Sequence, residues 1–300
     1  MALSRVNANA VTKSVADRLN VLRDLWRFCR MPMRGFHKVA SQCLLLGRFF
    51  LMMLLGSIPA FAGPPFQTDD PDPVPWHHYE AYLFSTTDQG RGVSSSELPA
   101  AEFNVGAAPN LQLHIIIPGS YVTPQGSYGI GDVELGAKYR FLQETGKRPE
   151  VGVFPLIEAP TGNSRLGLGN GQLWARLPIW VQKSHGPWTT YGGAGYQINR
   201  AHGMKDSLFA GWLVQRQITN RLVLGGEVYH QEAQSVGGRQ TTFIDPGGYY
   251  NFRENLSLLF MLGHTITGER HTVGYLGLYY TWGRKASQSS PSNSPLSFVQ

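Results

Sequence analysis

The chain has 300 residues, of which 15% are charged, 12% are aromatic and 35 are glycines. Soluble domains carry about 25% charged residues, so this composition indicates a β-rich protein with both faces of its sheet occupied. The pI of 9.3 does not indicate a nucleic-acid partner, because residues 1–62 hold nine of the 26 basic residues and two of the 20 acidic ones. Residues 63–300 are close to neutral, and the sequence therefore predicts no nucleic-acid surface.

A signal peptide is predicted near the N-terminus. Arg34, Lys38 and Arg48 precede the apolar run 49–55, and Ala60-Phe61-Ala62 follows it. This order gives a basic region, a short apolar region and an A-x-A cleavage site. The run is too short for a transmembrane helix, which needs about 20 residues. We therefore expect export, with a signal peptide over residues 31–62 that is cleaved after Ala62.

Residues 1–30 are not part of this signal-peptide pattern, and we treat them as an N-terminal extension of uncertain role. Both cysteines, Cys29 and Cys43, precede the cleavage site, so the mature chain offers no thiolate to a metal or to catalysis and is compatible with an oxidising compartment. Downstream of the leader there is no apolar stretch of about 18 residues. A membrane location therefore requires a closed barrel, which satisfies its backbone without a helix.

Residues 132–141 show the clearest strand pattern. Charged residues and a glycine occupy one parity, from Asp132 to Arg140, and apolar residues occupy the other, from Val133 to Phe141. Successive side chains of a strand point to opposite faces, so one face is charged and the other apolar. About twelve segments repeat this pattern, each about ten residues long, which is the length of a tilted membrane strand. They span residues 76–86, 99–108, 110–120, 131–142, 149–159, 172–183, 187–198, 207–218, 221–232, 241–252, 254–264 and 272–282.

Short and long connections alternate between these segments, as they do in outer-membrane barrels. Pro109-Asn110 and residues 219–221 form tight turns. The sequence thus predicts an all-β fold over residues 76–282, a transmembrane antiparallel up-and-down β-barrel of about 12 strands. A soluble sandwich is the alternative, but it would carry more charge. The predicted long connections are 87–98, 121–130, 160–171, 199–206, 233–240 and 265–271.

Other segments give no sign of a catalytic, cofactor or metal site. Residues 63–75 are rich in proline and aspartate and are predicted to be an extended periplasmic lead-in, with residues 69–72 as a solvated turn rather than a cation site. Residues 160–171 lack the GK[ST] of a phosphate loop and are predicted to lie outside. The histidines lack metal-ligand spacing and GxSxG is missing. Residues 283–300 are a Ser-rich tail predicted to be disordered.

Strand alternation also predicts which charged side chains face the lumen, where they must be paired or hydrated. They either line a narrow aqueous path or fill a closed barrel with ion pairs. An acid-rich wall disfavours anions unless Lys138, Arg140 and Arg176 cluster. The candidates are Glu80, Glu102, Asp132, Glu134, Lys138, Arg140, Glu150, Glu158, Arg176 and Glu227.

Several runs of sequence resemble one known family. They are GPPFQTDDPDP after the cleavage site, PNLQLHIIIP, GIGDVELGAKYRFLQE, VGVFPLIEAPTG, the pair LPIWVQK and GPWTTYGGAGY, and GGEVYHQ. Together they resemble a family of bacterial outer-membrane proteins described as a component of the meta-pathway of phenol degradation and as transporters. The resemblance covers nearly all of residues 63–282. It implies a Gram-negative outer-membrane barrel that takes up small aromatic or hydrophobic compounds, with no site residues to carry over.

The sequence therefore predicts a porin-like channel or transporter rather than an enzyme. Its expected partners are outer-membrane lipid, a small-molecule solute and the outer-membrane insertion machinery. Barrels of this kind usually end at an aromatic residue that closes the last strand; Trp282 takes that place, but the chain continues to Gln300. The alternatives are a lipase- or protease-like barrel enzyme and a closed structural barrel.

Overall fold

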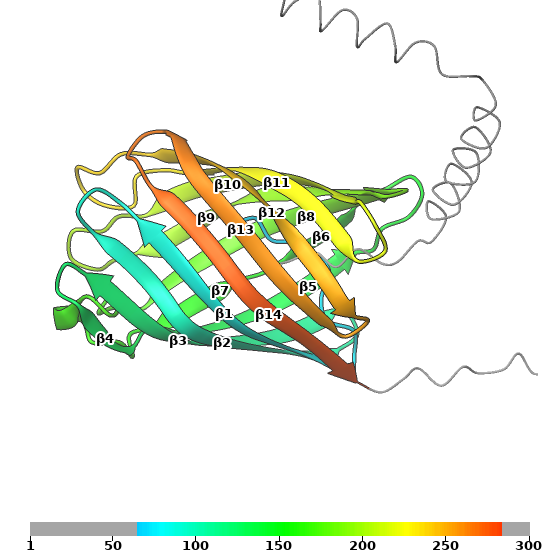
Figure 1. The fold of residues 1–300 in the computed structure, drawn as a ribbon, viewed down its shortest axis with the longest axis horizontal. Coiled ribbons are helices and arrows are strands. Elements are labelled where there is room, and N and C mark those ends of the chain that lie inside the picture. Colours follow the sequence, from blue (N-terminus) through cyan, green and yellow to red (C-terminus); the bar gives the residue numbers. More distant parts are fainter. Residues whose placement is uncertain (1–64, 284–300) are drawn as a thin grey trace, which may run out of the picture. The chain divides into compact units, whose positions relative to one another are not determined.

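The alternating segments form antiparallel strands whose first and last members pair with each other (Figure 1). A computed structural model describes residues 65–283; the predicted extension, the signal peptide and all but the first residue of the predicted tail lie outside them. No helix in this part of the chain is long and apolar enough to span a membrane. The elements are β1 (His78–Gln89), β2 (Ser94–Ala108), β3 (Leu111–Thr123), β4 (Ser127–Ile130), β5 (Val133–Leu142), β6 (Glu150–Val153), β7 (Leu156–Ala159), the 3₁₀ turn η3 (Ser164–Leu166), β8 (Trp174–His185), β9 (Trp188–Asn199), β10 (Ser207–Gln217), β11 (Leu222–Gln231), β12 (Thr241–Arg253), β13 (Leu256–Thr267) and β14 (Thr272–Gly283).

The barrel closes through the pairing of β1 with β14, which runs from His78↔Gly283 to Gln89↔Thr272. The wall has 12 strands, which confirms the predicted fold. Fourteen strands are labelled, but two features reduce them to 12 wall strands. Strand β4 pairs only with the outer part of β3 and leads into β5, while β6 and β7 are two halves of one wall strand. That strand breaks at Pro155, which has no backbone N–H for the ladder.

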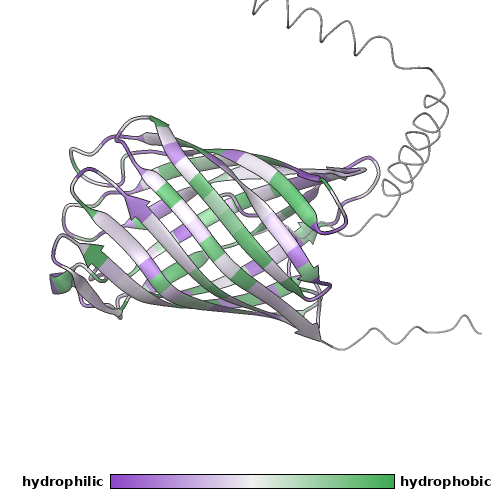
Figure 2. Cartoon of the chain, viewed as in Figure 1, coloured by the Kyte–Doolittle hydropathy of each residue, from purple (hydrophilic) through white to green (hydrophobic). Residues whose placement is uncertain are grey.

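The burial pattern is the reverse of that in a soluble protein. Along β10, Leu208, Trp212 and Val214 are exposed, whereas Ser207 and Gln215 are buried. Figure 2 shows the same alternation of hydrophobic and hydrophilic residues on strand after strand. The exposed apolar residues suit lipid, while the polar residues meet one another inside the barrel.

Aromatic rings gather where β14 ends and β1 begins. Trp282 packs against Tyr79 at 5.5 Å, Tyr280 at 5.6 Å and Phe103 at 5.9 Å between ring centroids. Such rings suit the membrane interface, because they have an apolar body and a polar edge. Trp282 therefore lies in an aromatic girdle on the last wall strand.

Three of the connections predicted to be long are short, so these predictions were wrong. Between β13 and β14 only residues 268–271 remain as the loop. Strand β1 continues to Gln89 and β2 begins at Ser94, which leaves residues 90–93 as the loop. Similarly, residues 124–126 separate β3 from β4. The residues that extend these strands are mostly serine, threonine and tyrosine. They are polar enough to lie beyond the lipid, and they still form the backbone hydrogen bonds of the sheet, as in the pair Thr87↔Ser96.

Candidate functional site

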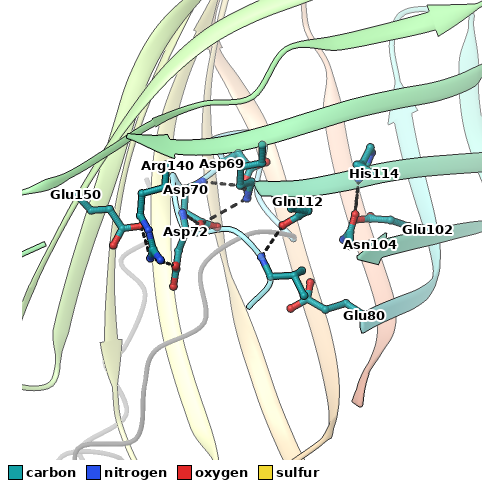
Figure 3. Close-up of polar contacts among 12 residues, drawn as sticks. Asp69, Asp70, Asp72, Glu80, Glu102, Asn104, Gln112, His114, Arg140 and Glu150 are labelled. Carbon is teal, nitrogen blue, oxygen red and sulfur yellow. Dashed lines mark hydrogen bonds and ion pairs between the residues drawn. The ribbon is translucent and has the colours of Figure 1, made fainter. Parts of the chain in front are cut away.

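The lumen contains a stretch of the chain's own N-terminal region, which we call the lumen segment (residues 66–75). Its backbone is held at both ends by wall side chains, and Figure 3 shows Gln112 at one of these ends. Glu227 accepts hydrogen bonds from the backbone N–H of Gln67 (2.7 Å) and of Thr68 (2.8 Å). At the other end the N–H of Val74 donates to Gln112 Oε1 at 2.9 Å. The sequence predicts a periplasmic lead-in here, whereas the structure places these residues inside the barrel.

The aspartates of the lumen segment neutralise two basic residues of β5. Lys138 Nζ lies 3.0 Å from Asp69 Oδ1 and 3.6 Å from Asp70 Oδ1. The guanidinium of Arg140 pairs with Asp72, as Figure 3 shows. Asp70 is fully buried, so the predicted solvated turn is instead an internal ion-pair cluster. Lys138 and Arg140 come from alternate positions of one strand and therefore point to the same face.

Wall glycines make room for the lumen segment. A Cβ atom on Gly211 of β10 would lie 1.9 Å from Thr68 Oγ1. One on Gly152 of β6 would lie 3.1 Å from Pro71 Cβ, and one on Gly106 of β2 would lie 2.0 Å from the Pro75 carbonyl oxygen. Larger residues at these positions would collide with the segment, so the wall is shaped to hold it.

A second polar cluster surrounds His114 of β3, and its burial depends on mutual hydrogen bonds. His114 Nδ1 lies 2.7 Å from Asn104 Oδ1, and Nε2 lies 2.9 Å from Glu134 Oε1. Asn104 Nδ2 in turn donates to Glu102 Oε1 at 2.7 Å. The cluster thus brings together two predicted residues, Glu102 and Glu134.

The remaining predicted residues have separate partners. Glu80 accepts from Tyr279 (2.6 Å) and Tyr82 (3.1 Å). Glu158 accepts from Trp174 Nε1 at 2.8 Å, and Glu150 lies 3.3 Å from Arg140.

Asp132 anchors the outer loop by accepting from the N–H groups of Gly162 (2.8 Å) and Asn170 (2.6 Å).

Arg176 stands apart from the other basic residues. Its guanidinium lies 4.1 Å from the ring centroid of Phe209 and donates to the hydroxyl of Tyr229. Among residues 65–283, no carboxylate lies within 4.0 Å of it. Lys138 and Arg140 bind the lumen segment instead, so the three bases do not form one cluster. The role of all these side chains in conduction stays a prediction.

Sequence reasoning missed several residues of this interior. His114 and Asp245 lie within predicted strands, but neither is among the predicted lumen-facing residues. Asp245 is fully buried and accepts from Gln67 Nε2 at 2.9 Å. Asp245 lies two residues after the apolar, buried Phe243 on β12, so strand alternation places both side chains on the same face and could have identified Asp245. No sequence pattern predicted that residues 66–75 lie inside the barrel.

Three cavities adjoin the lumen segment, and two of them share wall residues. Of these two, the larger, of about 590 Å³, is lined by Phe66 and Gln67 of the segment, and the smaller, of about 180 Å³, by Asp69 and Asp72. Both are also lined by Glu102, Ile116 and Glu134 of the wall. The segment therefore lies beside the route that would join them. No group of three or more possible metal ligands occurs in the described part of the chain.

Comparisons with solved structures identify the architecture. An outer membrane channel from Pseudomonas putida F1 superposes with a TM-score of 0.56 at 15% identity, covering 71% of this chain and 98% of that one. The KdgM porin in complex with disordered oligogalacturonate gives a TM-score of 0.50 at 9% identity, covering 68% and 99%. At such low identity the likeness shows the fold alone, which is that of outer-membrane channels.

Sequence comparison identifies the family. No curated protein is significantly similar to the chain. The model of the family described as "Putative MetA-pathway of phenol degradation", however, matches residues 81–282. That range runs from β1 to the penultimate residue of β14 and so takes in nearly the whole barrel wall. The chain is therefore an outer-membrane β-barrel that belongs to this family.

Proposed function

We propose that the protein is an outer-membrane channel for small compounds and that the lumen segment closes it. The observation that carries this proposal is the placement of residues 66–75 inside the barrel, held by Lys138, Arg140 and Glu227. A barrel that only needed a filled interior could fill it with wall side chains. A separate segment that is held by ion pairs, in space left by wall glycines, can instead leave the lumen as a unit.

The solutes we propose are small neutral aromatic or hydrophobic compounds. The family description supports this class, and so do the aromatic rings inside the wall. Tyr82, Tyr249 and Tyr279 are buried at one level of the barrel, and Trp180, Phe209 and Tyr229 at another. Neutral rings gain contacts there and are not repelled by the carboxylates of the wall.

Export also belongs to this proposal. Cleavage after Ala62 would leave Gly63 and Pro64 ahead of Pro65, so the lumen segment would begin at a free chain end. A free end can leave a lumen without opening the barrel. N-terminal sequencing of the protein from outer membranes tests this: a terminus at Gly63 is expected, and one upstream of residue 31 would contradict it. Insertion would follow the usual machinery, with Trp282 as the last aromatic of the barrel.

We propose transport rather than catalysis. At the outer mouth His271 Nδ1 lies 2.7 Å from Asp88, an arrangement that also orients catalytic histidines. A catalytic base, however, turns its second nitrogen to a nucleophile. Here Nε2 faces Glu269 at 3.7 Å, so His271 bridges two carboxylates and has a structural explanation.

Conductance in planar bilayers tests the channel. We expect the mature protein to be mostly closed and a deletion of residues 66–74 to conduct in steady steps. The matched control keeps the length of the segment and replaces Asp69, Asp70 and Asp72 by asparagine; it should open more often than the unaltered protein but still close. A deletion variant that inserts, migrates as a folded barrel on unheated gels and stays silent would refute the proposal.

A further inference from the structure

The unpaired cation of the lumen points to a ligand. Nine carboxylates of the wall line the interior around three bases, yet Arg176 has no carboxylate partner among residues 65–283. Its Nε atom is buried without a hydrogen-bond acceptor. Leaving a partly buried cation without a counter-ion is costly, and a bound anion would remove that cost.

Of the two cavities that Arg176 lines, the smaller has the right size and walls for a one-ring acid. Its volume is about 280 Å³, near the lower end of ligand pockets, which span about 300–1,000 Å³. Trp174, Tyr229 and Phe243 supply aromatic walls. The amides of Gln197, Gln231 and Gln234 lie on the same lining and add hydrogen-bonding groups. A guanidinium beside aromatic faces matches a carboxylate attached to a ring.

The carboxylates on this lining are already occupied. Asp88 and Glu269 both face His271, at 2.7 and 3.7 Å. Glu232 accepts from the backbone N–H of Leu208 at 3.0 Å. None of them is within ion-pair distance of Arg176. The repulsion that they would exert on an anion is therefore reduced by partners that they already have.

An anion can reach this cavity from outside without crossing the acid-rich interior. The cavity shares Asp88, Arg239, Glu269 and His271 with a larger hollow at the outer mouth, of about 890 Å³. That hollow also carries Arg91 and Arg270. Arg91, Arg239 and Arg270 form no ion pair with any described residue. Such a group of free cations raises the local concentration of anions at the mouth.

We propose that the cavity at Arg176 is a binding site for a small aromatic carboxylate that enters from the outer side. The carboxylate would bind the guanidinium that stacks on Phe209, and the ring would lie against Tyr229 and Phe243. Gln67 of the lumen segment lines the same cavity, so the site adjoins the closed lumen. Binding of the anion at this site does not rest on the proposed channel function, whose solutes are neutral.

Calorimetric titration of the folded protein in detergent tests the site, with benzoate as the probe and benzyl alcohol as its neutral counterpart. We expect saturable benzoate binding that is at least about tenfold tighter than that of benzyl alcohol, because charge-assisted hydrogen bonds to a guanidinium are the stronger ones. Arg176→Gln should weaken benzoate binding by about tenfold or more. Arg216→Gln is the matched control, because Arg216 is exposed and lies over Trp188 on β9, away from the cavity.

Equal binding of benzoate and benzyl alcohol, or unchanged benzoate binding in Arg176→Gln, would overturn the proposal. The comparison of the two probes needs only the unaltered protein, so it decides the question even if Arg176→Gln does not fold. Neither measurement needs an open pore. A silent deletion variant with intact benzoate binding would therefore refute the channel and leave the site, and the reverse result would do the opposite.

Discussion

At the scale of single residues, Lys138 has the strongest hold on the lumen segment. It is buried and touches two of the three aspartates of that segment. Removing one partner from a buried ion pair leaves the other charges unpaired, and this costs more than the pair contributes. The aspartates would regain solvation by leaving the lumen.

We therefore expect Lys138→Met to raise the open probability of the channel in bilayer recordings at least about tenfold, the change that about 1.4 kcal/mol produces. Lys183→Met is the control, since Lys183 pairs with Glu144 at 2.9 Å outside the lumen. An unchanged open probability in Lys138→Met would show that this ion pair does not hold the segment.

Neighbouring residues of β5 should respond differently to changes of charge. Leu135 is 40% exposed on the apolar face, whereas Glu134 is hydrogen-bonded to His114 inside. We expect Leu135→Arg to impair insertion by about 2–4 kcal/mol near the bilayer midplane and Glu134→Gln to insert normally. Folding into lipid vesicles, followed by the gel shift of unheated samples, measures both. Equal effects would contradict the assignment of the two faces.

At the scale of elements, the lumen segment and β10 fit closely enough to be linked. A Cβ on Gly211 would lie 3.1 Å from Thr68 Cβ, shorter than the roughly 3.5–4.5 Å that a disulfide spans, so a small shift of the lumen segment away from β10 would allow the bond to form. Residues 65–283 contain no cysteine, so an introduced pair has no competitor in the barrel.

We expect the double variant Thr68→Cys, Gly211→Cys to be silent in bilayers when oxidised and to open after a reducing agent is added. The single variant Thr68→Cys is the control, and its conductance should not change when the reductant is added. Openings of the oxidised double variant, with the crosslink confirmed by mass, would mean that ions pass while the segment is in place.

At the scale of the whole molecule, the interior carries more negative than positive groups. Lys138 and Arg140 are matched by the segment's aspartates and by Glu150. Once the segment has left and water reaches the wall carboxylates, the lumen therefore has a negative potential. The wall carboxylates are Glu80, Glu97, Glu102, Asp132, Glu134, Glu150, Glu158, Glu227 and Asp245.

The channel lacking residues 66–74 should accordingly prefer potassium over chloride, as measured by the reversal potential across a salt gradient. The preference should weaken as the salt approaches about 1 M, where the screening length falls to about 3 Å. Chloride preference at low salt would show that the three wall bases, and not the carboxylates, set the potential along the path.

The sequence by itself determined the barrel wall. Alternation along segments such as 132–141 specified which residues meet lipid, because a strand has a period of two whatever its neighbours are. The wall strands therefore lie close to their predicted spans. The polar extensions of β1 and β2 were missed, since a hairpin beyond the membrane has no apolar face to reveal it.

Only the tertiary structure decided what fills the barrel. Asp69, Asp70 and Asp72 look like a solvated turn until Lys138 and Arg140, far along the chain, are placed opposite them. Gly211 looks like any strand glycine until Thr68 lies against it. These contacts join residues that are distant in sequence, and no local period records them. Local alternation fixes the face of a side chain, but the closure of the ring fixes its partner.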